Sequence, residues 1–410
     1  MRILMINSVE KGSTGKIMFS VADCVQKYGH EVRCIVGTRK NSAKDNHRFF
    51  VSRPQSLFAY YFCYMVGYFT GMANFVGFMT TKKIINEIEK FDPDIIHLHN
   101  IHGDFINVKL LFEFLKMKKI KIVWTLHDCW GFTGRCPHFA AVKCNKWSTG
   151  CCQCPYPKSD YPRAIKDRTK VLWRLKKEYF TNIEEMTLVT PSKWLADFVK
   201  QSFLKDYPVQ VINNGIDLAV FKPTESNFRE KYNIPAEKYI LLGVAFGWGA
   251  RKGLDVFIEL SKHLPDNYQI VLVGTNDKTD KQLPKNIISI HRTQNQTELA
   301  EIYSAADLFV NPTREENYPT VNMESLACGT PVLTFRTGGS PEIIDETCGS
   351  VVDCDDIDAL ESEIKRICTE KPYSKDACLA RAKAFDMNER YEEYIELYNA
   401  LTVSKDGVKL

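Results

Sequence analysis

The chain has 410 residues, and its formal net charge at pH 7 is only +4, from 54 Lys and Arg against 50 Asp and Glu. That length is comfortable for two domains, and 44% hydrophobic with 25% charged residues is the composition of a globular protein, not of a disordered one. So small a net charge by itself argues neither for nor against a nucleic-acid partner, and on the motifs described below we expect none.

The N-terminus and the cysteines bear on the compartment. Met1 and Arg2 lead into a short apolar run that ends at Ile6, which is too short for the hydrophobic region of a signal peptide. The 14 cysteines then indicate a reducing compartment, where they stay as thiols or bind metal instead of forming disulfides. We therefore expect a cytoplasmic protein.

The first predicted element is an apolar strand, Ile3–Ile6, which is followed by a turn and a helix over Lys16–Tyr28. The turn contains Gly12 and Gly15, so backbone N–H groups and the positive end of the helix can approach a charged ligand there. The glycine spacing matches neither the dinucleotide fingerprint nor the Walker A motif. A second strand is predicted over Val32–Val36.

Residues 54–81 contain no Lys, Arg, Asp or Glu and are long enough to span a bilayer. The segment is rich in aromatic residues and glycine, however, and a crossing there would split the sheet of the first domain. Tyr and Trp favour the membrane interface. We therefore predict a membrane-docking or re-entrant helix pair, with a buried hydrophobic element and a spanning helix as the alternatives.

Histidines gather after two predicted strands. Three fall at the end of the strand Asp94–Leu98: His97, His99 and His102. Their spacing along a strand end is poor for a metal, so we expect residues of a binding cleft. The next strand, Ile122–Leu126, ends at His127, where cleft residues belong in an open sheet. Asp128 is expected either to orient His127 or to cap the next turn.

Residues 129–155 are rich in cysteine, and four of the cysteines have a knuckle-like spacing: Cys136, Cys144, Cys151 and Cys154. The C-x2-C end is a frequent half of a tetrahedral zinc site, although the first gap is longer than in a standard knuckle. A structural zinc is predicted on these four residues, with free thiols or one disulfide as the alternative.

The remaining elements of the first half are a long basic helix over Pro162–Phe180, strands over Met186–Val189 and Val209–Ile212, and a helix over Trp194–Gln201. A polar stretch then runs to Pro235. We place one Rossmann-like domain at residues 1–212, a second at 213–385, and a C-terminal helix within 386–410 that can pack back on the first.

In the second domain a strand over Tyr239–Val244 leads into a loop, Gly247–Gly253, and a helix over Leu254–Leu264. Arg251 and Lys252 are expected at the start of that helix. Two cations beside helix N–H groups suit a diphosphate better than either feature alone.

The stretch Ala306–Pro331 has the pattern of a strand, a polar loop, a helix and a Gly-x-Pro stop, which is half of a βαβ unit. It contains Glu316 in the loop and Glu324 on the helix, with seven residues between them. Ligands bind beyond the carboxyl ends of strands in open α/β sheets. Because a carboxylate accepts two hydrogen bonds in parallel, the pair suits the vicinal diol of a ribose or a hexose.

The run ENYPTVNME, from Glu316 to Glu324, resembles the E-x7-E signature of retaining glycosyltransferases of family 4. Members of that family have the GT-B fold, an α/β fold with two Rossmann-like domains facing across a cleft. The resemblance implies that Glu324 holds the nucleotide ribose and that Glu316 contacts the donor hexose. Asn317, Tyr318 and Thr320 lie within the motif and are assigned to the donor site.

Other motifs resemble the same family. The loop with Gly12 and Gly15 is implied to lie against the donor phosphate and the acceptor. Arg251 and Lys252 match an R-K-G motif that binds the donor diphosphate. His127 matches a histidine that hydrogen-bonds the donor sugar near the reacting carbon. The predicted catalytic residues are therefore His127, Arg251, Lys252 and Glu316.

The cysteine-rich segment closely resembles an insertion in the colanic-acid-type subgroup, whose members synthesise capsule and exopolysaccharide. The resemblance implies transfer of a sugar from a UDP- or GDP-linked donor to a polyprenyl-diphosphate-linked glycan, at the inner face of the cell membrane and without a catalytic metal. The first alternative is a GT-B enzyme that acts on a soluble acceptor, such as a sugar-nucleotide epimerase or a synthase. The second is a zinc-knuckle binding protein.

Overall fold

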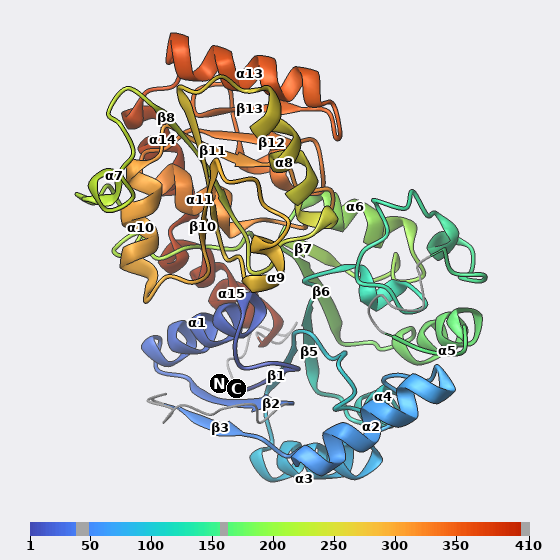
Figure 1. Ribbon diagram of the computed structural model, residues 1–410. Coiled ribbons are helices and arrows are strands. Elements are labelled where there is room, and N and C mark those ends of the chain that lie inside the picture. The colour runs from blue at the N-terminus through green and yellow to red at the C-terminus, as the bar shows by residue number, and fades with distance from the viewer. Residues whose placement is uncertain (38–48, 156–162, 403–410) are drawn as a thin grey trace. The chain divides into compact units, whose positions relative to one another are not determined.

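The computed structural model describes residues 1–37, 49–155 and 163–402. The chain divides into two compact units, each with its own parallel sheet (Figure 1). Unit 1 comprises Met1–Ile212 together with the C-terminal residues from Tyr391, and unit 2 comprises Asn213–Arg390. The strand orders below confirm the expected pair of Rossmann-like domains.

Unit 1 is built on a seven-stranded sheet in the order β3-β2-β1-β4-β5-β6-β7, in which every neighbouring pair is parallel. The strands are β1 (Arg2–Asn7), β2 (Glu31–Val36), β3 (Phe50–Ser52), β4 (Ile95–Leu98), β5 (Lys121–Thr125), β6 (Met186–Thr190) and β7 (Val209–Val211). Helices cover both faces of such a sheet, which explains why most strands read as continuous apolar runs. The order reverses between β1 and β4, and a reversal is where open α/β sheets bind ligands.

The helices of unit 1 are α1 (Ser13–Lys27), α2 (Leu57–Thr70), α3 (Phe78–Phe91), α4 (Val108–Met117), α5 (Thr169–Phe180) and α6 (Lys193–Gln201), with 3-10 turns η1 (Cys129–Phe132) and η2 (Lys146–Ser148). A further helix, α15 (Met387–Thr402), returns to this unit from unit 2. Its Tyr394 hydroxyl is hydrogen-bonded to Thr125 at the end of β5 (3.1 Å). The C-terminal helix therefore supplies part of the covering of the β4–β5 region.

Helix α5 is shorter than expected. It begins at Thr169, whereas the sequence pattern places its start at Pro162, which lies outside the described residues. The Asp167 carboxylate accepts hydrogen bonds from the Thr169 N–H (2.9 Å) and from the Cys154 N–H (2.9 Å). These contacts hold the preceding residues in a polar turn, so the helix starts only after them.

Residues 54–81 form α2 and the first turn of α3, with a short irregular connection. In the described ranges of the chain, no helix is long and apolar enough to cross a membrane, so the spanning alternative is wrong. The 14 residues of α2 extend about 21 Å, less than the hydrocarbon thickness of a bilayer. The buried alternative is also wrong for α2, because only Cys63 and Gly67 are buried on it.

Unit 2 has a six-stranded parallel sheet in the order β10-β9-β8-β11-β12-β13. Its strands are β8 (Tyr239–Val244), β9 (Tyr268–Val273), β10 (Ile287–Ile290), β11 (Leu308–Asn311), β12 (Val332–Phe335) and β13 (Gly349–Val352). Its helices are α7 (Phe228–Lys231), α8 (Leu254–His263), α9 (Asp277–Asp280), α10 (Gln296–Ala305), α11 (Thr320–Ala327), α12 (Ser340–Ile343), α13 (Ile357–Glu370) and α14 (Lys375–Ala382), with 3-10 turns η3 (Ala250–Lys252) and η4 (Lys383–Phe385). The order reverses between β8 and β11, so these two strands define the second ligand-binding edge.

Candidate functional site

Two loops of unit 2 meet where its strand order reverses. The loop after β8 contains Arg251 and Lys252, and the loop after β11 contains Glu316. Since β8 and β11 are adjacent and parallel, their carboxyl ends reach the same edge of the sheet. The two motifs that the sequence singled out for donor binding are thus brought together by the topology.

Lys252 and Glu316 form an ion pair across these two loops. Their side chains are 22% and 23% exposed, so the pair is partly shielded and still accessible to a ligand. The sequence assigns Lys252 to a phosphate and Glu316 to a sugar. Because the two groups touch, a ligand that engages both must carry an anionic oxygen close to a hydroxyl group, as a sugar diphosphate does.

Arg314 fastens the two loops to each other. Its guanidinium makes a paired interaction with the Asp255 carboxylate (2.9 and 2.8 Å), one with Asp355 (2.6 Å) and one with the Ala250 carbonyl oxygen. Its backbone N–H donates to the Arg251 carbonyl (2.9 Å). The hydrogen bonds to Asp255 and Asp355 raise the pKa of Arg314 further above its usual value, so its charge is permanent. The cationic segment is therefore held in place before any ligand arrives.

Arg251 and Lys252 lie directly before α8, as the sequence pattern predicts. They lie in the 3-10 turn η3, and Gly253 separates that turn from α8. Gly253 has φ 75°, and a Cβ placed on it would lie 2.4 Å from the Pro312 carbonyl oxygen, so only glycine fits there. Because Gly253 separates η3 from α8, Arg251 lies in a short turn and its side chain is exposed.

Glu324 lies on α11 and is partly exposed. The hydroxyl of the buried Tyr303 donates a hydrogen bond to its carboxylate at 3.2 Å. Burial raises the pKa of Tyr303, so the hydroxyl keeps its proton and remains a donor. This contact fixes the orientation of Glu324 toward a ligand.

The residues between the two glutamates are mostly buried. The Tyr318 ring belongs to the apolar core of unit 2, and the Tyr318 carbonyl accepts a hydrogen bond from Asn214 (3.3 Å). Asn317 is also buried, and its carbonyl accepts from the Gly339 N–H (2.8 Å). Thr320 is the first residue of α11. Their assignment to the donor site stays a prediction, and the structure gives the Tyr318 ring a packing role.

At the ligand-binding edge of unit 1, residues in and after β4 and β5 line a small cavity of about 10 Å³: His99, Asn100, Ile101, His102, Trp124, Leu126, His127, Asp128, Trp130 and Gly131. That volume is room for about one water molecule. The structure thus brings together His99, His102 and His127, three of the histidines that the sequence assigns to a cleft.

The fourth histidine, His97, is not a cleft residue. Its fully buried ring is hydrogen-bonded at Nδ1 to the Tyr398 hydroxyl (2.7 Å) and at Nε2 to the Thr125 hydroxyl (2.8 Å). Burial lowers the pKa of His97 to about 3, so the ring is neutral at pH 7. The expectation is wrong because α15, which packs on this strand, comes from the far end of the sequence.

His99 and His127 contact each other directly. Their Nδ1 and Nε2 atoms lie 2.9 Å apart, and the two rings are stacked at 5.2 Å. Burial lowers the pKa of His127 to about 4 and lowers that of His99 well below its usual value. Both rings are therefore neutral at pH 7, and in the pair one donates and the other accepts. Neutral rings suit uncharged hydroxyl groups and not a phosphate.

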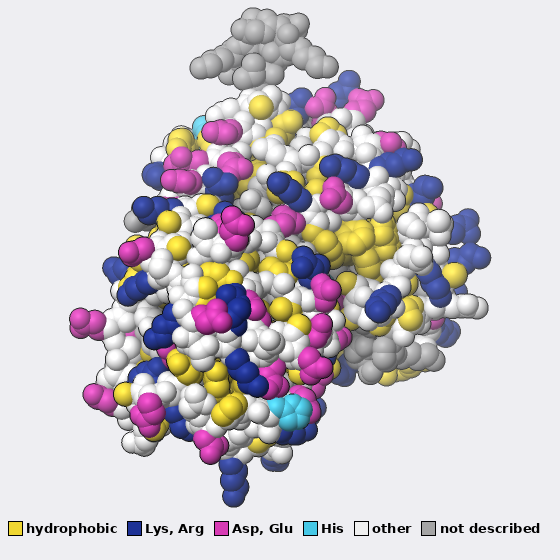
Figure 2. All heavy atoms as spheres, turned by 90° about the horizontal axis from the view of Figure 1, so that it is seen from above, with side chains coloured by type: hydrophobic (Ala, Val, Ile, Leu, Met, Phe, Trp, Pro, Cys, Tyr) yellow, Lys and Arg dark blue, Asp and Glu magenta, His cyan; other side chains and the backbone are white. Residues whose placement is uncertain are grey.

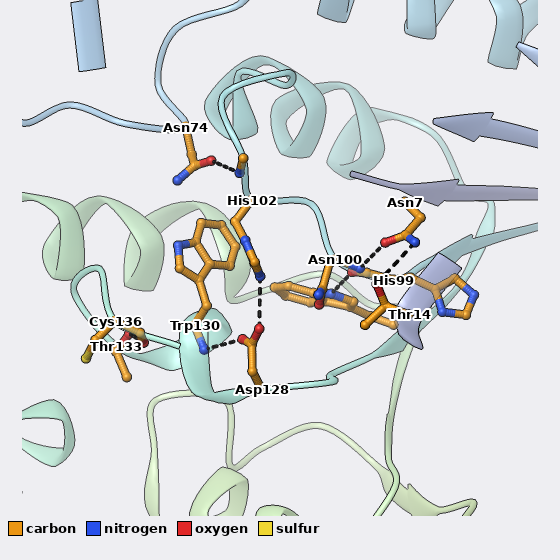
Figure 3. A network of polar contacts seen from close by, with 12 residues as sticks. Asn7, Thr14, Asn74, His99, Asn100, His102, Asp128, Trp130, Thr133 and Cys136 are labelled. Atoms are coloured by element: carbon orange, nitrogen blue, oxygen red, sulfur yellow. Dashed lines mark hydrogen bonds and ion pairs between the residues drawn. The ribbon is translucent and has the colours of Figure 1, made fainter. Parts of the chain in front are cut away.

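Asp128 caps the next turn, as one of the two alternatives expects. Its carboxylate accepts hydrogen bonds from the Trp130 N–H (2.8 Å) and from His102 Nε2 (2.9 Å), as Figure 3 shows. Burial by itself would raise the pKa of Asp128, but His102 and the Trp130 N–H lower it below its usual value. An ionised carboxylate therefore holds His102 and the backbone of Trp130, two of the residues that line the cavity.

The glycine loop after β1 is tied to the loop after β4. The Asn7 side chain accepts a hydrogen bond from the Asn100 N–H (3.2 Å), which Figure 3 also shows. Gly12 has φ 93°, and a Cβ on Gly15 would lie 2.2 Å from the Glu10 carbonyl oxygen. Both glycines are thus required for the loop to fold over the start of α1, and their contact with a donor phosphate stays a prediction.

The four cysteines assigned to zinc lie in one irregular segment of unit 1, and all are reduced: Cys136, Cys144, Cys151 and Cys154. The Gly134 N–H donates to Cys151 Sγ at 3.2 Å. The buried Lys176 donates to the carbonyl oxygens of Trp130 (2.7 Å) and Thr133 (3.1 Å) and interacts electrostatically with Cys136 and Cys151. Burial outweighs these contacts and raises the pKa of Cys136 to about 12 and that of Cys151 to about 11, so both are thiols at pH 7. Within the described chain, however, no three of the four sulfurs lie within 4.8 Å of one another, so the structure does not hold them as a preformed tetrahedron.

Comparison with known families decides the identity. Residues 15–220 match the model described as Glycosyltransferase Family 4, and residues 224–384 match the model described as Glycosyl transferases group 1. The chain belongs to the family 4 glycosyltransferases. It is accordingly an enzyme, and the family that the motifs around Glu316 and Glu324 indicate is confirmed.

Relatives of this glycosyltransferase include WcaC of Escherichia coli K12, a glycosyl transferase assigned to colanic acid biosynthesis. It is 26% identical over 326 residues, which is 75% of this chain and 77% of WcaC. A second relative from Escherichia coli, UDP-Gal:alpha-D-GlcNAc-diphosphoundecaprenol alpha-1,3-galactosyltransferase, is 24% identical over 228 residues. That alignment covers 50% of this chain and 60% of the relative.

Solved structures confirm the GT-B fold of the glycosyltransferase. Sucrose-phosphate synthase of Thermosynechococcus elongatus matches with a TM-score of 0.75 and 18% identity, over 98% of each chain. HepE of Anabaena in complex with UDP-glucose matches with a TM-score of 0.69 and 14% identity, over 98% of this chain and 100% of HepE. Identities this low establish the fold and not the substrate.

Sequence reasoning missed two residues that shape the site of unit 2. Arg314 lies only two positions before Glu316, and an arginine inside the motif loop was a usable signal. Tyr303 gave no signal, because it reaches Glu324 from a neighbouring helix. Its role required the packing of α10 against α11.

Proposed function

We propose that the enzyme transfers a hexose, with retention of configuration, from a UDP-linked donor to a polyprenyl-diphosphate-linked glycan during synthesis of a surface polysaccharide. The observation that carries the proposal is the contact between Lys252 and Glu316 at the strand-order reversal of unit 2. It presents a cation and a carboxylate side by side, which matches the diphosphate and the hydroxyl groups of one nucleotide sugar. The donor and the acceptor named for the galactosyltransferase relative support these two classes.

The leaving group is stabilised by cations in this proposal. As the bond between the anomeric carbon and the diphosphate oxygen breaks, negative charge develops on the diphosphate, and Arg251 and Lys252 stabilise it. Arg314 keeps both cations in position through the backbone of η3. Positioned cations do the work of a metal in this step, so no catalytic metal is required.

The hydroxyl groups are recognised by neutral or fixed side chains. Glu324, oriented by Tyr303, accepts hydrogen bonds from the ribose diol, and Glu316 accepts from the hexose. His127, kept neutral by burial, hydrogen-bonds a hydroxyl of the donor sugar. These assignments follow the residues that the family resemblance identifies.

Retention is assigned to a front-face mechanism. The acceptor oxygen forms its bond to the anomeric carbon on the face from which the diphosphate leaves, and the acceptor proton passes to a diphosphate oxygen. Atoms and charge balance without a protein base, so the carboxylate pair of glycosidases is not needed. The lipid-linked acceptor places the enzyme in the cytoplasm, peripherally associated with the inner face of the cell membrane.

The test is a thermal-shift series with UDP- and GDP-linked sugars on wild type, Glu324→Ala and the control Lys281→Ala, which changes an exposed lysine outside the motifs. A ligand that binds only the folded state raises the melting temperature by mass action. We expect UDP-sugars to stabilise wild type and the control, and Glu324→Ala to lose that shift. No shift with any nucleotide sugar, or an equal shift in Glu324→Ala, would reject the donor site.

We propose in addition that the cysteine segment takes up a structural zinc, with its sulfurs drawn closer than the structure describes. The C-x2-C spacing and the Gly134 N–H at Cys151 support it, because N–H donors stabilise zinc-bound thiolates. Metal analysis of the purified chain should find about one zinc, lost in Cys154→Ser and kept in Cys354→Ser, an exposed cysteine of unit 2. A metal-free, fully folded wild type would reject the zinc.

A further inference from the structure

Helix α2 exposes one apolar face to solvent. Residues four apart lie on one side of a helix, and the exposed side chains form two adjacent rows with that spacing: Leu57, Tyr61, Met65 and Phe69 in one, and Phe58 and Phe62 in the other. Phe58 is 81% exposed and Phe62 is 61% exposed. The adjoining start of α3 adds Phe78 and the 70% exposed Met79. A soluble monomer rarely leaves so many large apolar side chains together on its surface.

The opposite side of α2 is anchored, so the exposed face is a stable feature of the fold. The Ser56 hydroxyl caps the N-terminus by accepting from the Ala59 N–H (3.2 Å), and Gly71 closes the C-terminus in the left-handed conformation. Beneath the helix, Gly67 lies close to Asp104, whose Oδ1 accepts from the Asn74 N–H (3.1 Å). Figure 1 shows α2 and α3 along the lower rim of unit 1.

Two groups of basic side chains border this apolar face. Exposed Lys82 and Lys83 follow the start of α3, and the ammonium of Lys82 lies 4.6 Å from the centre of the Phe78 ring. Beside the last turn of α2, the Ile165 N–H donates to the Tyr68 carbonyl (2.9 Å). That contact brings up the exposed cations Lys166, Arg168 and Lys170. Asp167, the acid among them, accepts from neighbouring backbone N–H groups.

We infer that the exposed face of α2 and the first turn of α3, with this basic border, form a docking surface for an anionic lipid bilayer. The aromatic side chains enter the interfacial region of the bilayer, and the border cations face the acidic headgroups. The charge pattern differs from that in Figure 2, where side chains of both signs are interspersed over most of the face drawn. On α2 itself there is no charged residue.

The basic border favours a bilayer over a second copy of the chain. In a two-fold dimer through this face, each apolar stripe would meet its own copy. Lys82 and Lys83 would then approach the basic residues of the other copy, and like charges brought together at an interface oppose association. A bilayer with acidic lipids satisfies the apolar stripe and the cations at once.

Docking deepens the proposed function, because it brings the enzyme to the surface that holds a lipid-linked acceptor, and it can be measured without turnover. We would sediment the full chain with vesicles of phosphatidylcholine, alone or mixed with phosphatidylglycerol. The expected result is binding to the mixed vesicles that weakens with salt. One basic residue near an anionic surface changes binding by about fivefold, so Lys82→Glu with Lys83→Glu should weaken it more than tenfold.

The apolar face is tested by Phe58→Ser with Phe62→Ser, which should weaken vesicle binding about tenfold or more at every salt concentration. Matched controls are Met117→Ser, a 76% exposed side chain on α4, and Lys281→Glu with Lys285→Glu in unit 2; both should bind as wild type does. Equal binding of all variants, equal binding to neutral and anionic vesicles, or no binding at all would overturn the inference. A concentration-dependent dimer that Phe58→Ser abolishes would assign the face to self-association.

The nucleotide-sugar thermal shift separates the two proposals. We expect the Phe58→Ser, Phe62→Ser variant to show the same shift as wild type, because neither residue is among those assigned to the donor site. If UDP-sugar raises the melting temperature of wild type but wild type does not sediment with vesicles, the docking inference is rejected and the donor site stands. A wild type that binds vesicles and ignores nucleotide sugars rejects the donor assignment and leaves docking standing.

Discussion

The polar residues at the ligand-binding edges of the two units contrast in charge. In unit 2 the edge carries full charges in ion pairs, Lys252 with Glu316 and Arg314 with Asp255, on partly exposed loops. In unit 1 the edge carries histidines that burial keeps neutral, such as His127, beside one ionised carboxylate, Asp128, which is hydrogen-bonded to His102. Solvated, paired charges can bind a diphosphate with little loss of solvation, whereas neutral rings in an enclosed wall recognise hydroxyl groups. The same strand topology thus supports two different kinds of ligand recognition in the two units.

The largest expected effect comes from removing the positive charge of Lys252 in unit 2. Lys252→Ala should lower kcat by about 10²–10³-fold, because the variant loses a positive charge that stabilises the negative charge developing on the diphosphate in the transition state. The measurement is initial rate with saturating UDP-sugar, and Lys281→Ala is the matched control. A rate within about a factor of two of wild type would show that Lys252 does not stabilise the transition state. The ion pairs of unit 2 would then not explain diphosphate recognition.

A second effect tests how the cations are held. Arg314→Lys keeps the charge but loses the paired hydrogen bonds to Asp255, and donor affinity should fall about tenfold because η3 is no longer fixed. Arg366→Lys is the control, since Arg366 makes a similar pair with Glu363 on α13. Titration calorimetry with the donor measures both. Equal affinities in the two variants would show that Arg314 only stabilises the fold.

The neutral histidines predict a pH dependence of stability. The unfolded His97 takes up a proton near its ordinary pKa of about 6.5, whereas the folded residue resists protonation down to a pKa of about 3. Below pH 6.5 the unfolded state therefore binds more protons, and the free energy of unfolding falls as pH falls from 6.5 toward 4. Denaturant unfolding should show a loss of about 1–3 kcal/mol over that range, reduced in His97→Gln. His263→Gln, at an exposed position, should follow wild type, and an unchanged slope in His97→Gln would contradict the buried neutral ring.

The smallest expected effect concerns the exposed helix. Phe62→Ser should change the free energy of unfolding by no more than about 0.5 kcal/mol, because a surface side chain contributes little to the core. Chemical denaturation measures it, and Phe112→Ser, in the core of unit 1, is the contrast, with an expected loss of several kcal/mol, about 3–5. A large loss in Phe62→Ser would mean that the face is covered by protein.

Local patterns of the sequence predict most of the elements and the donor motif. The strand that the pattern predicts over Tyr239–Val244 is β8, with the same bounds, since apolar runs and turn residues are local signals. The glutamates of the motif also fell on a loop and a helix as their spacing predicts. The sequence pattern does not indicate the short edge strands β3 and β13, because pairing of an edge strand depends on its neighbour.

Which polar residues are accessible to a ligand depends on tertiary packing and cannot be predicted from local sequence patterns. His97 and His99 look equivalent along the chain, yet Tyr398 of α15 covers His97 while His99 lines the cavity. The same holds for the charge-free segment at α2, whose composition favours a docking helix but leaves a buried or a spanning one open. Burial is a property of contacts made far along the chain, and these contacts set the pKa of His97 and leave Phe58 exposed. The spacing of residues shows their periodicity, and only packing shows what each periodic face meets.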